Sequence, residues 1–462
     1  MKKQITIVSL FLLCALSAPA LSLSGPPRFA TLQSAATHVQ QPGQATQSLE
    51  TIMAATETSG TLLENVLVVL AKRYYDEPFR KDVLPRLAVQ YTARAKRAKT
   101  IGEQRNLVHD LLSRIPASHL GLLSKQTHLH IMYDLMGRPY PTVGFQLVEV
   151  KGKFYAFSVL EGGPGERAGL LAWDRIVSID GVSVEKSPRV EWRSDDAYIP
   201  DDRDPAVHYL TTGKGESVRF KIERRRGKFM EITVAVEDYS ALEAARNSAR
   251  IVKAGGRSFG YVHFWYVHMR GIPELLKEKF EGEFGNADGL IVDLRGRGGN
   301  ALAIMQIMNI LRADRAAKNR PIIALIDRQS RSAKDVLAFE MKKTGLARLV
   351  GEKTAGAVIP ATFANVGHDT ILMFPSYKLP NYTDLLEHKP VEPDVYVERA
   401  GPLSAGNDPI LKAGINEALK LLAKSVVSGR GSGVGGQGPE VRSQGPGLPV
   451  KSHLEFQIPE LR

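Results

Sequence analysis

The chain has 462 residues, of which 43% are hydrophobic, so it is long enough to bury the cores of about three domains. Its formal net charge of +12 favours contact with anionic surfaces, but no zinc-ligand spacing, aromatic-basic strand or recognition helix is present, which argues against a nucleic-acid-binding module. The single cysteine, Cys14, lies within a predicted signal peptide, so we expect neither a disulfide nor a reactive thiol in the mature chain.

Residues 1–20 have the pattern of a secretory signal peptide. Two lysines precede an apolar run from Ile5 to Leu16, and Ala18-Pro19-Ala20 supplies the small residues of a cleavage site. The run is too short to span a bilayer. We therefore expect a secreted or periplasmic protein with no stable membrane span. The large residue Leu13 before Cys14 argues against a lipid anchor at that cysteine.

Composition marks the segments at both ends of the folded region. Residues 21–48 are rich in Ala, Gln, Ser and Pro, which is typical of a flexible leader. Residues 426–462 begin with a stretch dominated by Gly, Ser and Pro, which is typical of a disordered tail. Between them we expect a helical domain at 49–125, a β-rich domain at 135–237, an α/β core at 255–400 and a C-terminal helix at 401–425.

The helical domain contains one helix with a clear start and end. Thr100 and Glu103 form a capping-box pattern, and apolar residues from Leu107 to Ile115 share one face of the helix. Pro116 ends it. The pair Ser118-His119 follows directly, so a hydroxyl and an imidazole lie side by side at the helix exit.

A second histidine pattern, His128-x-His130, lies on the alternating stretch THLHIMYD. Alternation places both rings on one face of a strand, which is how some zinc sites begin. No carboxylate or third histidine follows at a useful spacing. We therefore expect an exposed strand face here, with no metal ion and no cofactor.

The β-rich domain is predicted from short apolar runs broken by turns. The runs span 143–150, 153–160, 174–181, 217–225 and 229–236, with a short helix at 166–170. The stretch GPGERAGLLAWDRIVSIDG and the residues Gly144, Phe145, Gln146 and Leu147 before it resemble a PDZ domain of the bacterial, circularly permuted kind. The resemblance implies that an extended peptide lies beside an exposed strand and that amides of this loop receive its terminal carboxylate.

The α/β core alternates apolar strands with helices. Strands are expected at 257–264, 289–295, 321–327 and 348–351, and this spacing predicts a largely parallel sheet. The loops that follow successive parallel strands collect at one edge of the sheet. The fold class is therefore multidomain α/β.

Ser332 opens a helix directly after the third of these strands, where a hydroxyl can be exposed as a nucleophile. Ser332-x-x-Asp335 also fits an ordinary helix cap, which is a common role of serine. In the neighbouring loop, the glycine-rich turn 296–300 has bare amides that suit a phosphate, an oxyanion or simply a tight turn. Because both loops belong to one sheet edge, the two turns can meet and form an oxyanion hole.

The ordered motifs GYVHF, GLIVDLRGRGG, LIDRQSRSAKD, GEKTAGA and LEHKPVEPDV resemble the tail-specific, or C-terminal processing, serine peptidase family over residues 255–397. The resemblance implies a crotonase-like α/β core preceded by helical and PDZ domains. One branch of the family uses a lysine base, but Ala357 stands at that position. The other branch, which is similar to the tricorn core protease, uses a Ser-His pair and a glutamate, and these match Ser118-His119 and Glu387.

The resemblance implies a role for each matching residue. The histidine takes the proton of the nucleophilic serine and returns it to the leaving amine, while the second serine and the glutamate orient neighbouring groups. The implied catalytic residues are Ser332, His119, Ser118 and Glu387, and the implied oxyanion amides are those of Gly298, Gly299 and Ala333.

The expected substrates are polypeptides, held through their C-termini, and no pattern in the sequence fixes an oligomeric state. A second function stays open. Arg297 and Asn300 stand where the family more often has Asn and Gly, and a chain that lost activity through such changes would be a secreted PDZ protein that binds peptides without hydrolysing them.

Overall fold

The computed structural model describes residues 60–192 and 206–430. The predicted signal peptide and leader lie outside these residues, as does the predicted tail from 431 onwards. The described residues fall into two units that divide after residue 422. The described part of the first unit combines helices with four β-sheets, so the protein has a mixed α/β fold. No helix within the described ranges is long and apolar enough to cross a membrane.

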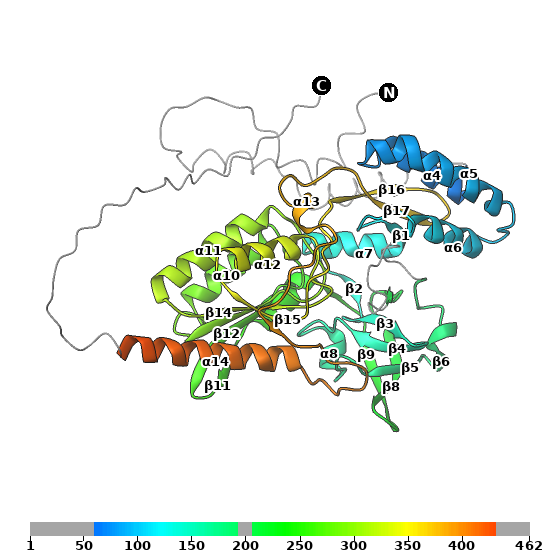
Figure 1. Cartoon of the computed structure of the whole chain (residues 1–462). Coiled ribbons are helices and arrows are strands. Elements are labelled where there is room, and N and C mark those ends of the chain that lie inside the picture. The colour runs from blue at the N-terminus through cyan, green and yellow to red at the C-terminus, as the bar shows by residue number, and fades with distance from the viewer. Residues whose placement is uncertain (1–59, 193–205, 431–462) are drawn as a thin grey trace, which may run out of the picture. The chain divides into compact units, whose positions relative to one another are not determined.

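The N-terminal part of the described chain is helical, as predicted. It contains α4 (Leu62–Arg73), the π-helix η1 (Phe79–Val83), α5 (Leu84–Ala95) and α6 (Ile101–Leu112), shown in Figure 1. The capping box predicted for α6 is present, because the Thr100 hydroxyl accepts the Glu103 amide and the Glu103 carboxylate accepts the Thr100 amide. Buried Leu111 packs in one apolar cluster with Phe374, so these helices are held against a sheet from the C-terminal half of the chain.

That sheet has three antiparallel strands in the order β1 (Gly121–Ser124), β17 (Thr370–Pro375) and β16 (Ala361–Asn365). Gly121 pairs with Met373, and Leu123 pairs with Ile371. The residues directly after Ser118 and His119 are therefore fixed to a strand that lies far away in the sequence.

The next segment forms the helix α7 (Lys125–Met136), not the predicted alternating strand. Ser124 caps its start and Gly137, with φ 64°, ends it. His128 and His130 are only 7% and 4% exposed, and residues two apart on a helix do not share a face. The prediction of an exposed strand face is therefore wrong. Within the described ranges, no group of three His, Cys, Asp or Glu side chains could hold a metal ion.

A seven-stranded antiparallel sheet follows. Its order is β7 (Ala206–His208), β3 (Gln146–Val150), β4 (Lys153–Phe157), β5 (Arg175–Ile179), β8 (Ser217–Arg225) and β9 (Lys228–Ala235), with β6 (Val182–Ser183) beside β5. The five predicted runs become β3, β4, β5, β8 and β9, whereas no pattern predicted β7. The short helix α8 (Pro164–Arg167) starts two residues before the predicted one, and the 3-10 helix η2 (Val184–Lys186) follows β6. A two-stranded pair, β2 (Tyr140–Thr142) with β10 (Glu237–Tyr239), flanks this region.

The third large element is a six-stranded sheet. Its order is β11 (Arg250–Ala254), β12 (Arg257–His263), β13 (Gly289–Asp293), β14 (Ile322–Ile326), β15 (Arg348–Gly351) and β18 (Val395–Tyr396). Only β11 is antiparallel to its neighbour, so the predicted parallel sheet is confirmed. Every residue of β13 and β14 is buried, as expected for strands covered on both faces.

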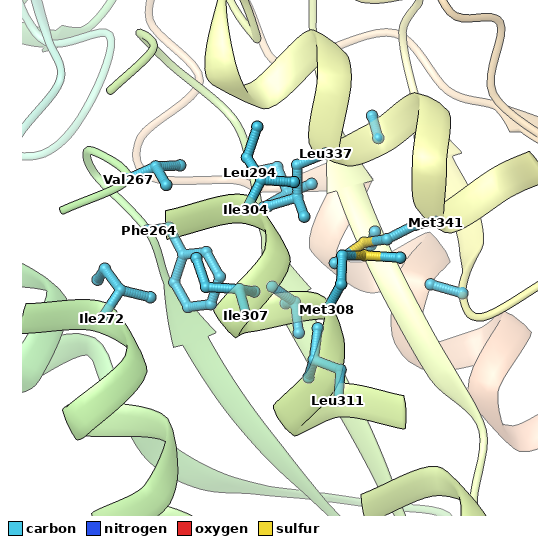
Figure 2. Close-up of a cluster of buried hydrophobic side chains, with 14 of the residues drawn as sticks. Phe264, Val267, Ile272, Leu294, Ile304, Ile307, Met308, Leu311, Leu337 and Met341 are labelled. Atoms are coloured by element: carbon cyan, nitrogen blue, oxygen red, sulfur yellow. The ribbon is translucent and has the colours of Figure 1, made fainter. Parts of the chain in front are cut away.

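Helices cover both faces of this sheet. The helices α10 (Gly271–Glu281), α11 (Ala303–Lys318) and α12 (Ala333–Lys343) lie on one face (Figure 1). Figure 2 shows how side chains such as Phe264, Ile307 and Leu337 interlock there. On the other face, α14 (Pro409–Arg430) packs through Ile410. This helix starts later than the helix predicted at 401–425 and extends past its predicted end. Burial of each large apolar side chain contributes roughly 1.5–3 kcal/mol, which gives the strand ends a rigid base. The remaining helices are α9 (Ala241–Ser248) and α13 (Thr383–Leu386).

Candidate active site

Ser332 lies between β14 and α12, directly before the first residue of α12. Its backbone has φ 58° and ψ −121°, whereas an ordinary cap residue is extended. Such a conformation costs a non-glycine residue about 1–3 kcal/mol and needs support from its surroundings. The Ser332 amide donates to the Ala357 carbonyl at 2.8 Å and to Asp335 Oδ2 at 3.0 Å. Ser332 does occupy the cap position, but in a strained conformation that capping alone does not require.

Asp335 fixes this turn from inside the protein. Its buried carboxylate also accepts the amides of Gly356 at 2.9 Å and Ala357 at 3.1 Å. Burial raises the pKa of Asp335 to about 6, and hydrogen bonds from Thr354 and these two amides lower it in part. One carboxylate therefore joins the Ser332 turn to the loop after β15.

The glycine turn after β13 lies against Ser332. A β-carbon placed on Gly298 would lie 3.1 Å from Ser332 Cβ and 3.7 Å from Ser332 Oγ. Gly299 has φ 138°, and a β-carbon there would lie 2.3 Å from the backbone nitrogen of Val267. Val267 donates to the Gly298 carbonyl at 3.1 Å, and Asn300 donates to the Val267 carbonyl at 2.7 Å. Only glycine fits at 299, so the turn is fixed between Val267 and Ser332.

The predicted oxyanion amides therefore come from two loops that meet at Ser332. Ala333 is the first residue of α12, so its amide has no acceptor within the hydrogen-bond ladder of that helix. The N-terminus of a helix also carries partial positive charge, which favours an anion. The parallel sheet brings the Gly298 turn beside the Ser332 turn, as the order of β13 and β14 requires.

The structure also brings together Ser118, His119 and Glu387. Ser118 and His119 lie in the link between α6 and β1, and Glu387 ends α13. Glu387 Oε1 accepts the Ser118 amide at 2.8 Å, and Glu387 Oε2 accepts the Ser118 hydroxyl at 3.2 Å. Ser118 Oγ lies 3.0 Å from His119 Nδ1. These residues from distant parts of the sequence form one hydrogen-bonded chain.

These hydrogen bonds determine which nitrogen of His119 is basic. The Ser118 hydroxyl has one proton, which it donates to Glu387. The hydrogen bond between Ser118 Oγ and His119 Nδ1 then needs its proton from the imidazole. A neutral His119 therefore carries its proton on Nδ1 and keeps its lone pair on Nε2, the form required of a general base.

Glu387 also connects this hydrogen-bonded group to the loop that contacts Ser332. Its Oε2 also accepts the amides of Val358 at 2.8 Å and Ile359 at 3.1 Å. The neighbouring residue, Ala357, accepts the Ser332 amide. The four predicted catalytic residues are thus gathered around one short loop, which Asp335 holds at one end and Glu387 at the other.

Lys334, two residues after Ser332, is a further candidate for a residue that positions the site, and the motifs did not single it out. It is fully buried, and its Nζ donates to the carbonyls of Arg295 at 2.8 Å and Trp265 at 3.2 Å. Burial lowers its pKa to about 7. Trp265 lies two residues before Val267, and Arg295 directly precedes the glycine turn 296–300. The two hydrogen bonds of Lys334 therefore hold both sides of that turn in place. A lysine in the first turn of a buried helix was the available sequence signal.

The predicted peptide-binding residues lie where β3 begins. Gly144 has φ 75°, and its amide already donates to the Thr142 hydroxyl at 3.0 Å. Phe145 is buried and packs edge-on against Phe220, with ring centroids 5.2 Å apart. Gln146 is the first residue of β3. The side chain of Phe145 therefore belongs to the core of the seven-stranded sheet.

Strand β3 lacks the free edge that the PDZ resemblance implied. Leu147 pairs with Ala156 of β4 on one side and with His208 of β7 on the other, and the β7 pairing continues to Glu149. The prediction of an exposed strand is therefore wrong for residues 147–149. A three-residue segment of the chain itself occupies that edge.

Comparisons with known proteins give one family match and several distant relatives. Residues 306–397, which include Ser332 and Glu387, match peptidase family S41. A carboxyl-terminal-processing protease of Synechocystis sp. is 23% identical over 373 residues, covering 75% of this chain and 82% of that protein. The tricorn protease of Thermoplasma acidophilum is 27% identical over 278 residues, covering 52% of this chain and 25% of that protein.

Among solved structures, a photosystem II D1 C-terminal processing protease aligns with 74% of this chain and 94% of its own, at 17% identity and a TM-score of 0.44. The sequence matches carry the assignment. Residues 306–397 therefore form a serine peptidase region of family S41, and the chain is a distant relative of the C-terminal processing proteases and of tricorn protease.

Proposed function

We propose that the protein is an extracytoplasmic serine endopeptidase that hydrolyses polypeptides through an acyl-enzyme at Ser332. The observation that carries the proposal is the hydrogen-bonded chain from Glu387 through Ser118 to His119, which shares its anchoring loop with Ser332. A nucleophile, a base with the correct tautomer and an orienting carboxylate are the parts that such a reaction needs.

The steps follow from these parts. As Ser332 Oγ attacks the carbonyl carbon of the scissile bond, His119 Nε2 takes the hydroxyl proton. The imidazolium then protonates the leaving amine, the C–N bond breaks, and the acyl group stays on Ser332. Water attacks the ester, giving its proton to His119, which returns a proton to Ser332 as the acid leaves. The Glu387 carboxylate favours the imidazolium through Ser118, and general base catalysis of this kind contributes about 10²–10⁴ in rate.

The negative charge on the carbonyl oxygen needs donors that are already in place. The amides of Gly298, Gly299 and Ala333 are proposed as these donors. Loss of one oxyanion donor typically lowers kcat by about 10²–10³. The fixed glycine turn and the helix N-terminus supply them without rearrangement during the reaction.

Docking is proposed to use the seven-stranded sheet as a PDZ-type module beside a crotonase-like core. A substrate segment that adds to β3 has to replace β7, because β7 holds the same edge. The proposed location, secreted or periplasmic, rests on the signal-peptide pattern of residues 1–20.

A fluorophosphonate probe with peptide mapping tests the nucleophile. The probe should label Ser332 in the native protein, and His119→Gln should lower the labelling rate by about 10²–10⁴ because the base is lost. Ser183→Ala, at an exposed serine of β6, is the matched control and should label as the native chain does. Folded protein without label on Ser332 would exclude the acyl-enzyme.

A peptide-binding protein without activity is the second candidate. Arg297 and Asn300 in the glycine turn favour it, because they depart from the pattern of the family that the chain resembles. Turnover of an unstructured peptide by the native chain and by Ser332→Ala decides between the two. Equal rates would leave only the binding function.

A further inference from the structure

The hairpin formed by β8 and β9 ends in a cluster of positive charge. Arg225 pairs with Lys228, and the two-residue turn between them is Arg226-Gly227. The three cationic side chains are exposed, and within the described ranges none of them forms an ion pair. The preceding cation, Arg224, is instead held by Asp174. The end of the hairpin therefore carries three positive charges that no acidic side chain compensates.

Two large apolar side chains are exposed beside these charges. Phe229 is 53% exposed and Met230 is 44% exposed. Lys221 Nζ lies 5.6 Å from the centroid of the Phe229 ring, so one more cation is close to this ring. Phe229 pairs with Glu223 and Met230 pairs with Ile222, and successive residues of a strand point to opposite faces. Apolar atoms therefore meet solvent on both faces of the hairpin.

The end of the hairpin extends past its neighbour in the sheet. The pairing between β5 and β8 runs only from Phe220 to Glu223. A strand advances about 3.4 Å per residue, so Arg226 lies about 10 Å beyond the last of these pairs. This end projects away from the sheet beside the label β8 (Figure 1). The headgroup layer of a lipid bilayer is about 5–8 Å deep, so the projection is long enough to cross it.

We propose that the end of this hairpin, residues 225–230, docks the protein on a lipid bilayer with anionic headgroups. The cations pair with the phosphates of the headgroups, while Phe229 and Met230 enter the boundary between headgroups and acyl chains. The net charge of +12 favours the same kind of surface.

A bilayer fits both the charge and the apolar side chains of the hairpin, whereas other anionic partners fit only one of them. A nucleic acid offers phosphates but no apolar layer for Phe229 and Met230. A protein that bound one face of the hairpin would leave the apolar side chain on the other face in water. The inference goes beyond the peptidase function and does not depend on it.

Cosedimentation of the full chain with lipid vesicles tests the proposal. The native protein should bind vesicles of equal parts phosphatidylglycerol and phosphatidylcholine at least about 25-fold more tightly than vesicles of phosphatidylcholine alone. Replacing both arginines, as Arg225→Ser with Arg226→Ser, should weaken binding to the anionic vesicles about 25-fold, because each cation contributes about fivefold. Phe229→Ser should weaken it about tenfold, and Phe229→Leu should bind as the native chain does.

Matched controls come from the helical region. Lys96→Ser with Arg97→Ser removes two adjacent exposed cations, and Val89→Ser removes an apolar side chain that is 76% exposed. Both controls should bind the anionic vesicles as the native chain does. Equal losses in the hairpin variants and their controls would make overall charge and hydrophobicity the cause, and would overturn the proposal. Thermal unfolding of each variant checks that the fold is kept.

A local measurement separates the hairpin from any lipid contact made by residues 1–20. Phe229→Trp adds a fluorophore at the hairpin, and lipids brominated on their acyl chains quench only the tryptophans that reach those chains. On such anionic vesicles, the emission added by Phe229→Trp should fall about twofold or more, because the side chain lies at the acyl boundary. The emission added by Val89→Trp should not change. Unquenched emission in Phe229→Trp, or native protein that binds a DNA duplex but not the anionic vesicles, overturns the proposal.

Discussion

The six-stranded and the seven-stranded sheets differ in where their proposed functional residues lie. In the first these residues lie at the ends of strands, and in the second they lie along the edge of a strand. In the six-stranded sheet, helices cover both faces and the chemistry lies in loops at the ends of β13 and β14. In the seven-stranded sheet, the strand proposed for docking, β3, is paired on its outer edge with only three residues of β7. Unpaired edges recruit other chains, so native proteins cover them. The proposed catalytic site is therefore built on a rigid base, whereas the proposed docking edge is covered by a strand of only three residues.

Gly299→Ala should have the largest effect, because it disrupts the rigid glycine turn of the six-stranded sheet. The new β-carbon would lie 2.3 Å from the Val267 nitrogen, at a φ of 138° that side chains rarely adopt. The turn must therefore shift away from Ser332. We expect kcat to fall by about 100-fold or more, as for loss of an oxyanion donor, while KM changes little. Steady-state kinetics on an unstructured peptide measure both quantities.

Gly227→Ala is the matched control in the seven-stranded sheet. Gly227 also has a positive φ, 73°, but an added β-carbon there meets no atom within 4 Å. Only backbone strain is expected, which lowers the free energy of unfolding by about 1 kcal/mol and leaves kcat unchanged. A similar loss of kcat in both variants would remove any special role of the core turn.

Lys334→Met removes the buried amino group that holds the glycine turn, and tests how much that group contributes to the stability of the core. The folded pKa is about 7 and the ordinary value is 10.5, so between these values the unfolded state binds more protons. The native free energy of unfolding therefore rises with pH in this window, and methionine abolishes that rise. From pH 7 to 9, we expect the native protein to gain roughly 2–3 kcal/mol relative to the variant. Thermal unfolding at several pH values measures this difference.

Lys343→Met serves as the control for that experiment. Lys343 lies on the same helix with its side chain 62% exposed, so its replacement should shift stability by an amount that does not depend on pH. If Lys334→Met and Lys343→Met behave alike across the pH range, the buried ammonium group is not the cause.

Proline at Val207 should produce the smallest effect and tests how readily β7 leaves β3. Val207 pairs with Val148 in the middle of the ladder, and proline removes its backbone donor. We expect the free energy of unfolding to fall by about 1–2 kcal/mol and KM for peptides to fall about threefold, because the edge is no longer contested. Val182→Pro in β6 is the control. An unchanged KM in Val207→Pro would contradict docking at β3.

The strands of the core and the two turns that carry Gly298 and Ser332 were predictable because their signals are local. Runs at 289–295 and 321–327 predict β13 and β14, since strands buried on both faces leave a continuous apolar pattern. The parallel order of these strands then predicts that the loops carrying Gly298 and Ser332 meet. The positions of Ser118, His119 and Glu387 depended on family resemblance, because their contacts span the whole core.

Elements that depend on distant pairing were not predictable. β1 has four buried residues and exists because it pairs with β17. β7 has three residues and exists because β3 offers an edge. In α7 the alternation of THLHIMYD was misleading, although Ser124 before the helix and Gly137 after it were available signals. Lys334 needed the carbonyls of Trp265 and Arg295 to reveal its role.

The contact between Ser118 and Glu387 has a consequence for synthesis of the protein. These residues are 269 positions apart, and the imidazole of His119 is oriented through them. During translation, Ser332 leaves the ribosome before Glu387 does. A nascent chain that ends before Glu387 therefore lacks the carboxylate that orients Ser118, so under the proposed mechanism it has no complete active site until almost all of the described region has been made.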